Sequence, residues 1–223
     1  MSEGDERYYK RLFHFDFIRA LGDAPRRAMF DFFMANLRPS AAETVLDLGA
    51  TSLPEPQENI FELYYPHPGR TTAAGTEDAS FLEQRHPGLK FVRIESGKPL
   101  PFADNAFDVG FSNAVIEHVG SRANQALFLG ELIRVSKRCF LTTPNRWYPV
   151  ELHTRLPFVH WLPARAFRAF IGTIGFEFYS KEENLNLLSA SELLALLPPG
   201  TKARLSRHSF LGLTSNLSLS IEG

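Results

Sequence analysis

Val45-Leu46-Asp47-Leu48-Gly49-Ala50 is the stretch that decides the fold, because it reads as a buried strand ending in an acid and a glycine. Two later stretches read as a loop, a second strand and the start of a helix. They are Leu100-Pro101-Phe102-Ala103-Asp104-Asn105-Ala106-Phe107-Asp108 and Ser112-Asn113-Ala114-Val115-Ile116-Glu117-His118-Val119. Strands that alternate with helices predict an α/β fold with a mainly parallel sheet covered on both faces.

Length and composition restrict the class of protein. The chain has 223 residues, which fits one α/β domain, and its 44% apolar content supplies a sizeable core. A net charge of −1 provides no field for a polyanion, so we expect no nucleic-acid partner. The one cysteine, Cys139, lies in an apolar run and is predicted to be a core residue in a cytoplasmic protein. No signal peptide and no membrane span are expected.

Apolar periodicity and turn residues predict the remaining elements. Residues 7–37 read as one or two helices, interrupted at Gly22-Asp23-Ala24-Pro25. Further strands are expected at 71–75, 89–94, 107–111 and 138–143, and helices at 78–84, 123–135, 164–171 and 189–197, the last starting near Ser191 and Glu192. Two final strands, 203–210 and 216–221, have no helix between them and should therefore be antiparallel.

The order of these motifs resembles the class I S-adenosylmethionine-dependent methyltransferases of the type 11 group, especially the branch with small-molecule or lipid-like acceptors. The resemblance covers roughly residues 40–145 and implies a Rossmann-like seven-stranded sheet with an antiparallel final strand. It also implies an enzyme that uses S-adenosylmethionine. We expect a single domain over 1–223, made of N-terminal helices (1–40), a cofactor-binding core (41–145), an acceptor-side insertion or lid (146–182), and a closing helix with two strands (183–223).

The turn after the first strand is where the resemblance places the cofactor. The family pattern is Asp-x-Gly-x-Gly-x-Gly, whereas this chain has Asp47 and Gly49 but Thr51 and Leu53 in place of the later glycines. The Thr51 hydroxyl offers a donor to the cofactor, and the long loop that follows offers Asn59, Phe61 and Glu62 as substitute contacts. An ordinary strand-to-loop connection is the alternative, for which one glycine suffices.

Further cofactor contacts are expected at the ends of the next strands. Glu77 matches the acid that binds the ribose, with Asp78 beside it or capping the following helix. Either Glu95 or Ser96 matches the acid beside the adenine, on which Leu100 would pack. Ser112 and its neighbour Asn113 would line the methionine half of the cofactor, or would cap a helix instead; the cofactor-binding candidates are Asp47, Gly49, Thr51, Glu77, Asp78, Glu95, Ser96 and Ser112.

Histidines are the candidates for acid–base work, because they titrate near neutral pH. They are His118, early in the expected helix after the fourth strand, and His153 and His160 in the lid; Glu117 and Glu151 are the acidic candidates. Some ubiquinone-pathway O-methyltransferases carry Glu-x-x-Glu-His at this place and bind a metal. Here Ala114 replaces the first acid, so we expect no dedicated metal site and read His118 as structural or substrate-lining.

The segment 146–171 is predicted to cover the acceptor pocket, with His153 or His160 pointing into it. Its prolines and aromatic side chains suit an apolar wall, which favours a lipid-like or aromatic small molecule as acceptor. The helix at 164–171 has a basic and aromatic character that suits contact with a membrane surface, or packing over the pocket. The alternative to an enzyme is a non-catalytic binding or regulatory protein of the same fold that has a degenerate glycine motif; an NAD-dependent oxidoreductase is disfavoured because no Gly-x-Gly-x-x-Gly turn follows a strand.

Overall fold

The computed structural model describes the backbone of residues 16–222, with side chains from residue 26 onward. The part of the expected N-terminal helices before Asp16 lies outside the described residues. Within the described range, no helix combines the length and the apolar character needed to cross a bilayer.

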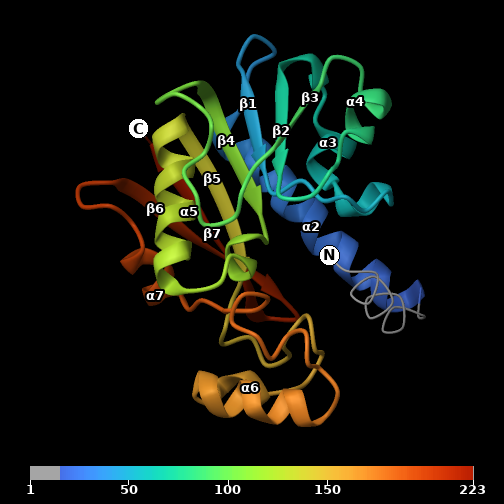
Figure 1. Ribbon diagram of the computed structural model, residues 1–223, viewed down its shortest axis with the longest axis vertical. Coiled ribbons are helices and arrows are strands. Elements are labelled where there is room, and N and C mark those ends of the chain that lie inside the picture. Colours follow the sequence, from blue (N-terminus) through green and yellow to red (C-terminus); the bar gives the residue numbers. More distant parts are fainter. Residues whose placement is uncertain (1–15, 223) are drawn as a thin grey trace.

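A seven-stranded sheet in the order β3-β2-β1-β4-β5-β7-β6 forms the centre of the molecule (Figure 1). The strands are β1 (Val45–Leu48), β2 (Thr71–Gly75), β3 (Lys90–Arg93), β4 (Phe107–Asn113), β5 (Ser136–Pro144), β6 (Lys202–Phe210) and β7 (Leu213–Glu222). The first five run parallel, and β7 pairs antiparallel with both β5 and β6. This topology confirms the predicted fold class, including the antiparallel pair at the end of the chain.

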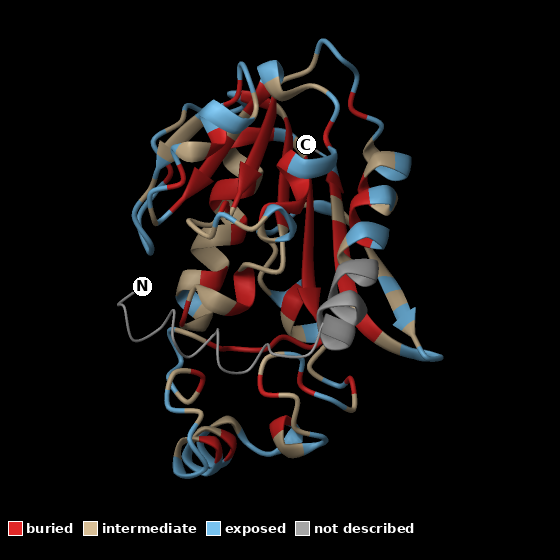
Figure 2. Cartoon of the chain, turned by 90° about the vertical axis from the view of Figure 1, so that its right-hand side faces the viewer, coloured by how far each residue is buried: buried red, intermediate tan, exposed pale blue. Residues whose placement is uncertain are grey.

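Helices cover both faces of the sheet. The α-helices are α2 (Asp16–Leu37), α3 (Ile60–Tyr64), α4 (Phe81–Arg85), α5 (Arg122–Val135), α6 (Ala164–Thr173) and α7 (Ala190–Ala195), and the short 3₁₀ helices are η1 (Pro56–Glu58), η2 (Pro68–Arg70), η3 (Ile116–His118) and η4 (Val159–Trp161). Helices α2 and α3 pack on one face, and α5 and α7 pack on the other. The central strands between these layers are buried, as Figure 2 shows in red.

The two faces of the sheet have different cores. On the side of α5 and α7 the buried side chains are mainly leucine and isoleucine, with Cys139 among them as predicted. On the side of α2 and α3 they are mainly aromatic. Phe33 lies edge-on to Phe111 with ring centroids 4.8 Å apart, and Phe61 lies 4.8 Å from Phe111. The unusual number of phenylalanines is thus explained in part by one layer that anchors α2 and α3 to β4.

The loop before β4 is held by side chains from α5. Glu131 accepts a hydrogen bond from the Leu100 amide, and Arg134 donates to the carbonyl oxygens of Leu100 and Phe102. Arg134 also pairs with Asp104 at 2.7 Å. These contacts satisfy backbone groups that no strand or helix covers, so the loop has a defined path into β4.

Local boundaries differ from the expected ones at four places. Helix α2 continues through residues 22–25, where the sequence predicts an interruption. Ser112 and Asn113 belong to β4 rather than to a helix, and Glu117 and His118 lie in the 3₁₀ turn η3. Helix α5 starts at Arg122, one residue before the expected start, and Ser121 caps it after the turn at Gly120, whose φ is +90°. The cap of α7 is Ser189, which forms a capping box with Glu192, rather than Ser191.

Gly110, in the middle of β4, allows α5 and β5 to approach the strand closely. A Cβ atom at this position would lie 2.4 Å from Ser136 Oγ and 2.8 Å from Leu132 Cδ1. We expect Gly110→Ala to lower the free energy of unfolding by about 1–3 kcal/mol, measured by urea denaturation. Gly130→Ala is the matched control, because a Cβ there meets nothing within 4 Å and should add about 1 kcal/mol of helix stability. Equal effects of both substitutions would contradict this account of the packing.

Candidate functional site

The turn after β1 is built around Gly49. Its φ of +125° is a conformation that side chains disfavour, and a Cβ atom would lie 2.2 Å from Val115 Cγ2. The amides of Gly49 and Ala50 both donate to the Ala74 carbonyl, which joins the end of β1 to β2. Position 49 therefore requires glycine for two reasons, namely its positive φ and the lack of space for a Cβ atom beside Val115.

Asn59 stabilises the part of the turn where the later glycines are replaced. Its Oδ1 accepts from the Thr51 amide at 2.9 Å, and its Nδ2 donates to the carbonyl oxygens of Thr51 and Leu53. The Thr51 hydroxyl accepts from the Leu53 amide. The Thr51 hydroxyl is thus occupied by a hydrogen bond within the turn. Asn59 bonds several backbone groups of this turn, which in a glycine-rich turn would be open to a ligand.

Two carboxyl groups meet at the end of β1. Asp47 and Glu62, which comes from α3, are both buried and interact with each other, and no other side chain among the described residues donates to Glu62. Burial raises the pKa of Asp47 to about 7, and burial together with Asp47 raises the pKa of Glu62 well above its usual value. Both carboxyls are therefore shifted toward the protonated form, and a proton on one of them can be donated to the other.

A small cavity of about 30 Å³ lies beside this pair. Its lining includes Asp47, Gly49, Asn59, Asn113 and Val115, so it joins the ends of β1 and β4 to the loop that leads into α3. A cavity of this size holds about one water molecule. Residues 58–61 form one side of the lining, so a ligand of nucleoside size requires this segment to move outward.

Glu77 lies just past the end of β2, within reach of the same turn. Ser52 donates its hydroxyl proton to the Glu77 carboxylate, so the acid is already oriented by the β1 loop. Asp78 instead accepts from the Ser80 amide and caps no helix, since α4 begins without a side-chain cap. Of the two acids, Glu77 is the one connected to the turn around Gly49.

The other predicted cofactor contacts are dispersed. Glu95 is exposed and pairs with Lys98 at 2.5 Å, Ser96 is exposed, and Leu100 packs in the main apolar core. Ser112 is fully buried and donates to the Leu48 carbonyl, so it ties β4 to β1 rather than facing the cavity. Its neighbour Asn113 lines the cavity instead, because side chains alternate along a strand.

His118 and His153 come together beyond the ends of β4 and β5, as the lid folds back over η3. Their rings lie 4.7 Å apart at 87°. His118 Nδ1 donates to the Asn184 carbonyl at 2.6 Å, and His153 Nδ1 contacts the Glu151 carboxylate at 2.7 Å. Glu117 is fully buried beside them; its Oε2 accepts from the Thr143 hydroxyl, and its Oε1 has no partner among the described residues. We call Glu117, His118 and His153 the η3 cluster.

The pKa values of the groups in and around the η3 cluster are shifted in different directions. Burial lowers the pKa of His118 to about 4, and burial raises that of Glu117 to about 7. Burial opposes protonation of His153 too, but the neighbouring Glu151 outweighs it and the pKa of His153 is raised. Glu151 keeps a pKa of about 2 despite its burial, because His153 and the amides of His153 and Thr154 stabilise its charge.

His160 lies apart from the η3 cluster. It is buried in η4, where Nε2 contacts the Tyr148 carbonyl at 2.8 Å and the ring packs near Trp161 and Phe167. Trp147, Phe158 and Trp161 do not close the core, since 53%, 54% and 40% of their surfaces are exposed. The lid thus presents aromatic side chains outward and brings only His153 toward η3.

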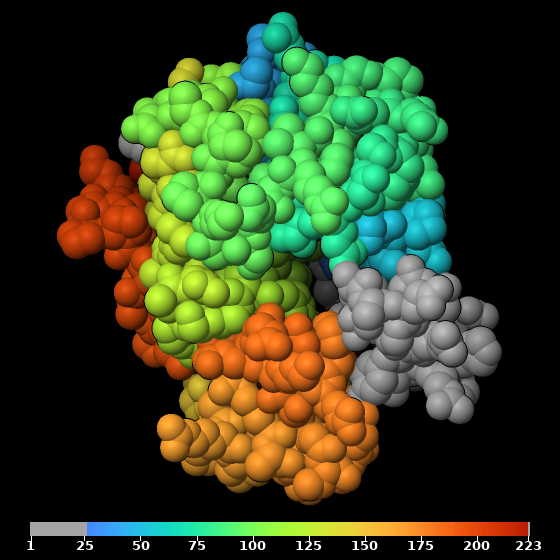
Figure 3. Space-filling view, viewed as in Figure 1, coloured from blue at the N-terminus to red at the C-terminus, as the bar shows by residue number. Residues whose placement is uncertain are grey.

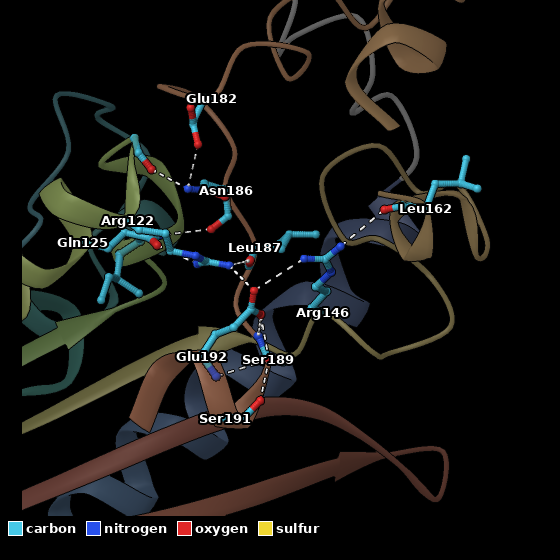
Figure 4. Close-up of polar contacts among 12 residues, drawn as sticks. Arg122, Gln125, Arg146, Leu162, Glu182, Asn186, Leu187, Ser189, Ser191 and Glu192 are labelled. Carbon is cyan, nitrogen blue, oxygen red and sulfur yellow. Dashed lines mark hydrogen bonds and ion pairs between the residues drawn. The ribbon is translucent and has the colours of Figure 1, made fainter. Parts of the chain in front are cut away.

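The base of the lid is fixed by charged side chains. Glu192 of α7 lies between Arg122 at 2.5 Å and Arg146 at 3.6 Å, and Arg146 also reaches the Leu162 carbonyl (Figure 4). Figure 3 shows the lid, in gold and orange, at the lower end of the molecule. The contacts that orient the η3 cluster, from Asn184 and from Tyr179 against His153, come from the returning arm of this segment. Neither residue has a sequence signal, because each acts through contacts distant in the chain.

Comparisons with known proteins agree with this architecture. Residues 72–138 match the family model described as "Methyltransferase domain". The match begins in β2, after the altered glycine turn. No curated protein matches the sequence.

Solved structures share the fold at low sequence identity. PH0226 protein from Pyrococcus horikoshii OT3 has a TM-score of 0.61 at 14% identity, over 96% of this chain and 98% of that chain. A SAM-dependent methyltransferase from Aquifex aeolicus has a TM-score of 0.53 at 15% identity, over 93% and 98%. The 1,6-didemethyltoxoflavin-N1-methyltransferase of Burkholderia thailandensis, solved with its substrate and S-adenosylhomocysteine, has a TM-score of 0.57 at 15% identity, over 89% and 78%.

The family model covers the centre of the sheet, and the solved structures cover almost the whole chain. The matched methyltransferase domain and the strand order together show that the chain has the fold of the S-adenosylmethionine-dependent methyltransferases.

Proposed function

We propose that the protein transfers a methyl group from S-adenosylmethionine to a small or lipid-like acceptor that lies between the sheet and the lid. The observation that carries the proposal is the position of the η3 cluster. It begins two residues after Val115, which lines the cavity at Gly49, and it is completed by His153 from the lid. A polar cluster for an acceptor thus adjoins the turn where the donor belongs.

The donor contacts follow from the same edge of the sheet. Glu77 would accept hydrogen bonds from the ribose hydroxyls, and Asp47 would lie near the positively charged methionine half. The donor's size requires residues 56–64 to swing away from the cavity. Asn59 is the side chain that joins this segment to the Thr51 turn, so its three hydrogen bonds are the contacts that opening would strain or break.

Methyl transfer depends mainly on the alignment of the acceptor atom with the methyl carbon and the sulfur of the donor. The acceptor atom attacks the methyl carbon in line with the sulfur, the carbon–sulfur bond breaks, and S-adenosylhomocysteine leaves. Correct orientation alone supplies up to about 7–11 kcal/mol in favourable systems. In this proposal His118 and His153 hold the reacting end of the acceptor, and His160 only shapes the lid.

Cofactor binding tests the proposal directly. Isothermal titration calorimetry of the full chain with S-adenosylhomocysteine should give saturable binding at one site. A folded protein that shows no binding at millimolar ligand would favour the non-catalytic alternative, to which Thr51, Leu53 and the small cavity would then belong.

Glu77→Ala should weaken S-adenosylhomocysteine binding by at least tenfold, because hydrogen bonds to a charged carboxylate contribute about 1.5–3 kcal/mol. Asp78→Ala is the matched control and should change the dissociation constant by less than about threefold, since each 1.4 kcal/mol corresponds to tenfold. Titration calorimetry of both variants measures the difference. A larger loss for Asp78→Ala would place the ribose on the other acid.

S-adenosylmethionine binding should release a proton below about pH 7. The pKa of Asp47, about 7 without ligand, falls when a cation lies beside it, so the bound state holds fewer protons and affinity rises with pH through this range. Calorimetry at pH 6.5 in buffers of different ionisation enthalpy counts the protons. Asp47→Asn should abolish the release, and an unchanged count in that variant would assign the proton elsewhere.

His153→Ala should lower turnover by about 10²-fold or more, while the affinity for S-adenosylhomocysteine stays within threefold. The readout is S-adenosylhomocysteine released with a panel of phenolic and lipid-linked acceptors. His160→Asn serves as the control within the same segment. Equal loss of turnover in both variants would show that the lid contributes through its shape alone.

The outward aromatic side chains of the lid support a lipid-like acceptor and contact with a lipid surface, which we propose as the partner of α6. Phe158, Trp161 and Phe170 are exposed, and Arg165 is exposed on the same helix as Phe170. Co-sedimentation with anionic vesicles should fall at least fivefold in the double variant Phe158→Ser, Trp161→Ser. Leu211→Ser, on the exposed β6–β7 hairpin, is the control and should change nothing. Equal sedimentation of all three proteins would remove the membrane from the proposal.

A further inference from the structure

The η3 cluster has the donor set of a divalent metal site. One ligand atom from each of Glu117, His118 and His153 lies within 4.8 Å of the others, and Glu117 Oε1 lies 4.0 Å from His118 Nε2. Ligand atoms around a tetrahedral ion with bonds of about 2.1 Å are about 3.4 Å apart. Small side-chain rotations therefore bring the three atoms onto one ion.

The hydrogen bonds around the cluster leave the correct atoms free. A carbonyl only accepts, so His118 must carry its proton on Nδ1, where it meets Asn184, and its Nε2 keeps a lone pair. His153 has its Nδ1 on the Glu151 carboxylate, which leaves Nε2 toward the cluster. Histidine ligands of metals characteristically have the second nitrogen bound to a carbonyl or carboxylate in this way.

The buried carboxylate is the independent observation. Glu117 is fully buried, its Oε2 is satisfied by Thr143, and its Oε1 has no hydrogen-bond partner in the described part of the chain. An unpartnered buried carboxylate oxygen is costly, and coordination of a cation would satisfy it. Among the described residues, the two imidazoles that are the remaining ligands lie beside it, and the Glu151 carboxylate acts on it from behind His153.

We propose that Glu117, His118 and His153 bind one divalent ion of the zinc class, with Glu151 as the residue that orients His153. Two imidazoles and one carboxylate form a set that suits Zn²⁺ and Co²⁺ rather than Mg²⁺ or Ca²⁺, which prefer oxygen ligands. Three protein ligands leave a coordination position for water or for an oxygen of the acceptor. The proposal differs from the expectation of no metal site drawn from Ala114, because its third ligand comes from the lid instead of from that position.

Cobalt is the probe, since its visible absorption reports ligand geometry. Tag-free full-length protein, stripped with chelator, should bind one Co²⁺ with visible d–d bands, and Zn²⁺ should displace it. His118→Ala, His153→Ala and Glu117→Gln should each weaken Co²⁺ binding at least 100-fold. Glu151→Gln should weaken it about 10–100-fold, as expected for a residue that acts through a ligand.

His160→Asn is the matched control, a buried histidine in the same segment that should leave Co²⁺ binding unchanged. Circular dichroism of each variant separates loss of the site from loss of the fold. Should the wild type bind no Co²⁺ at millimolar concentration, or should His118→Ala and His153→Ala bind as well as the wild type, the proposal fails and the cluster holds a proton only. S-adenosylhomocysteine binding, measured on the same samples, is independent of this outcome and tests methyl transfer separately.

Discussion

The parallel pairing of β1, β4 and β5 is the constraint on which the rest of the structure depends. Asp47 aligns with Phe111, and Asn113 aligns with Thr142, so the three strands end at the same edge of the sheet. Residues that follow these ends are therefore brought together without being close in sequence. The turn at Gly49, the cavity beside Asn113 and the η3 cluster all lie along this edge because of that register.

Burial of acidic side chains at this edge lowers the stability of the folded protein. Asp47, Glu62 and Glu117 are buried acids, and burial raises the pKa of each. Raised carboxyl pKa values mean that the folded chain holds protons the unfolded chain has released, so these groups reduce stability as the pH rises above about 4 and toward 7. Apolar residues of similar size would avoid this cost. Ligands with positive charge would account for the presence of these acids, namely the methyl donor proposed at Asp47 and the ion proposed at Glu117.

The sequence predicted the sheet well because its signals were local. Apolar runs bounded by glycine and proline gave each strand to within a few residues, and the absence of a helix between the last two strands gave the antiparallel pair. Local signals also explain the errors. The Gly22–Pro25 run resembles a break, yet α2 continues through it, and Ser112 resembles a cap although it lies within a strand. At Ser112 the surrounding tertiary structure decides the outcome, because its hydroxyl donates to the Leu48 carbonyl of the neighbouring strand.

The candidate site was less accessible to sequence reasoning, because it depends on contacts across long separations. The sequence predicts Asn59 as a substitute for the missing glycine-turn contacts, but its three hydrogen bonds to the backbone of the Thr51 turn depend on how the loop folds back. The Glu117-His118 pair was visible, but His153 lies 35 positions after His118 and enters only through the fold of the lid. From the sequence alone, the absence of an acid at position 114 therefore argues against a metal site, because the proximity of His153 is not visible there.

The two departures from the family pattern have a common structural basis. At the donor turn, the glycines at 51 and 53 are replaced, and a side chain from the following loop takes over their backbone partners. At η3, the acid at 114 is replaced, and a side chain from the lid completes the polar cluster. In each case a residue of the family pattern that follows a strand is absent, and a side chain from a more distant segment, Asn59 or His153, lies at that place. In the proposed function, donor binding therefore depends on an outward movement of residues 56–64, and acceptor binding depends on the position of the lid, so the sheet edge alone does not form the complete site.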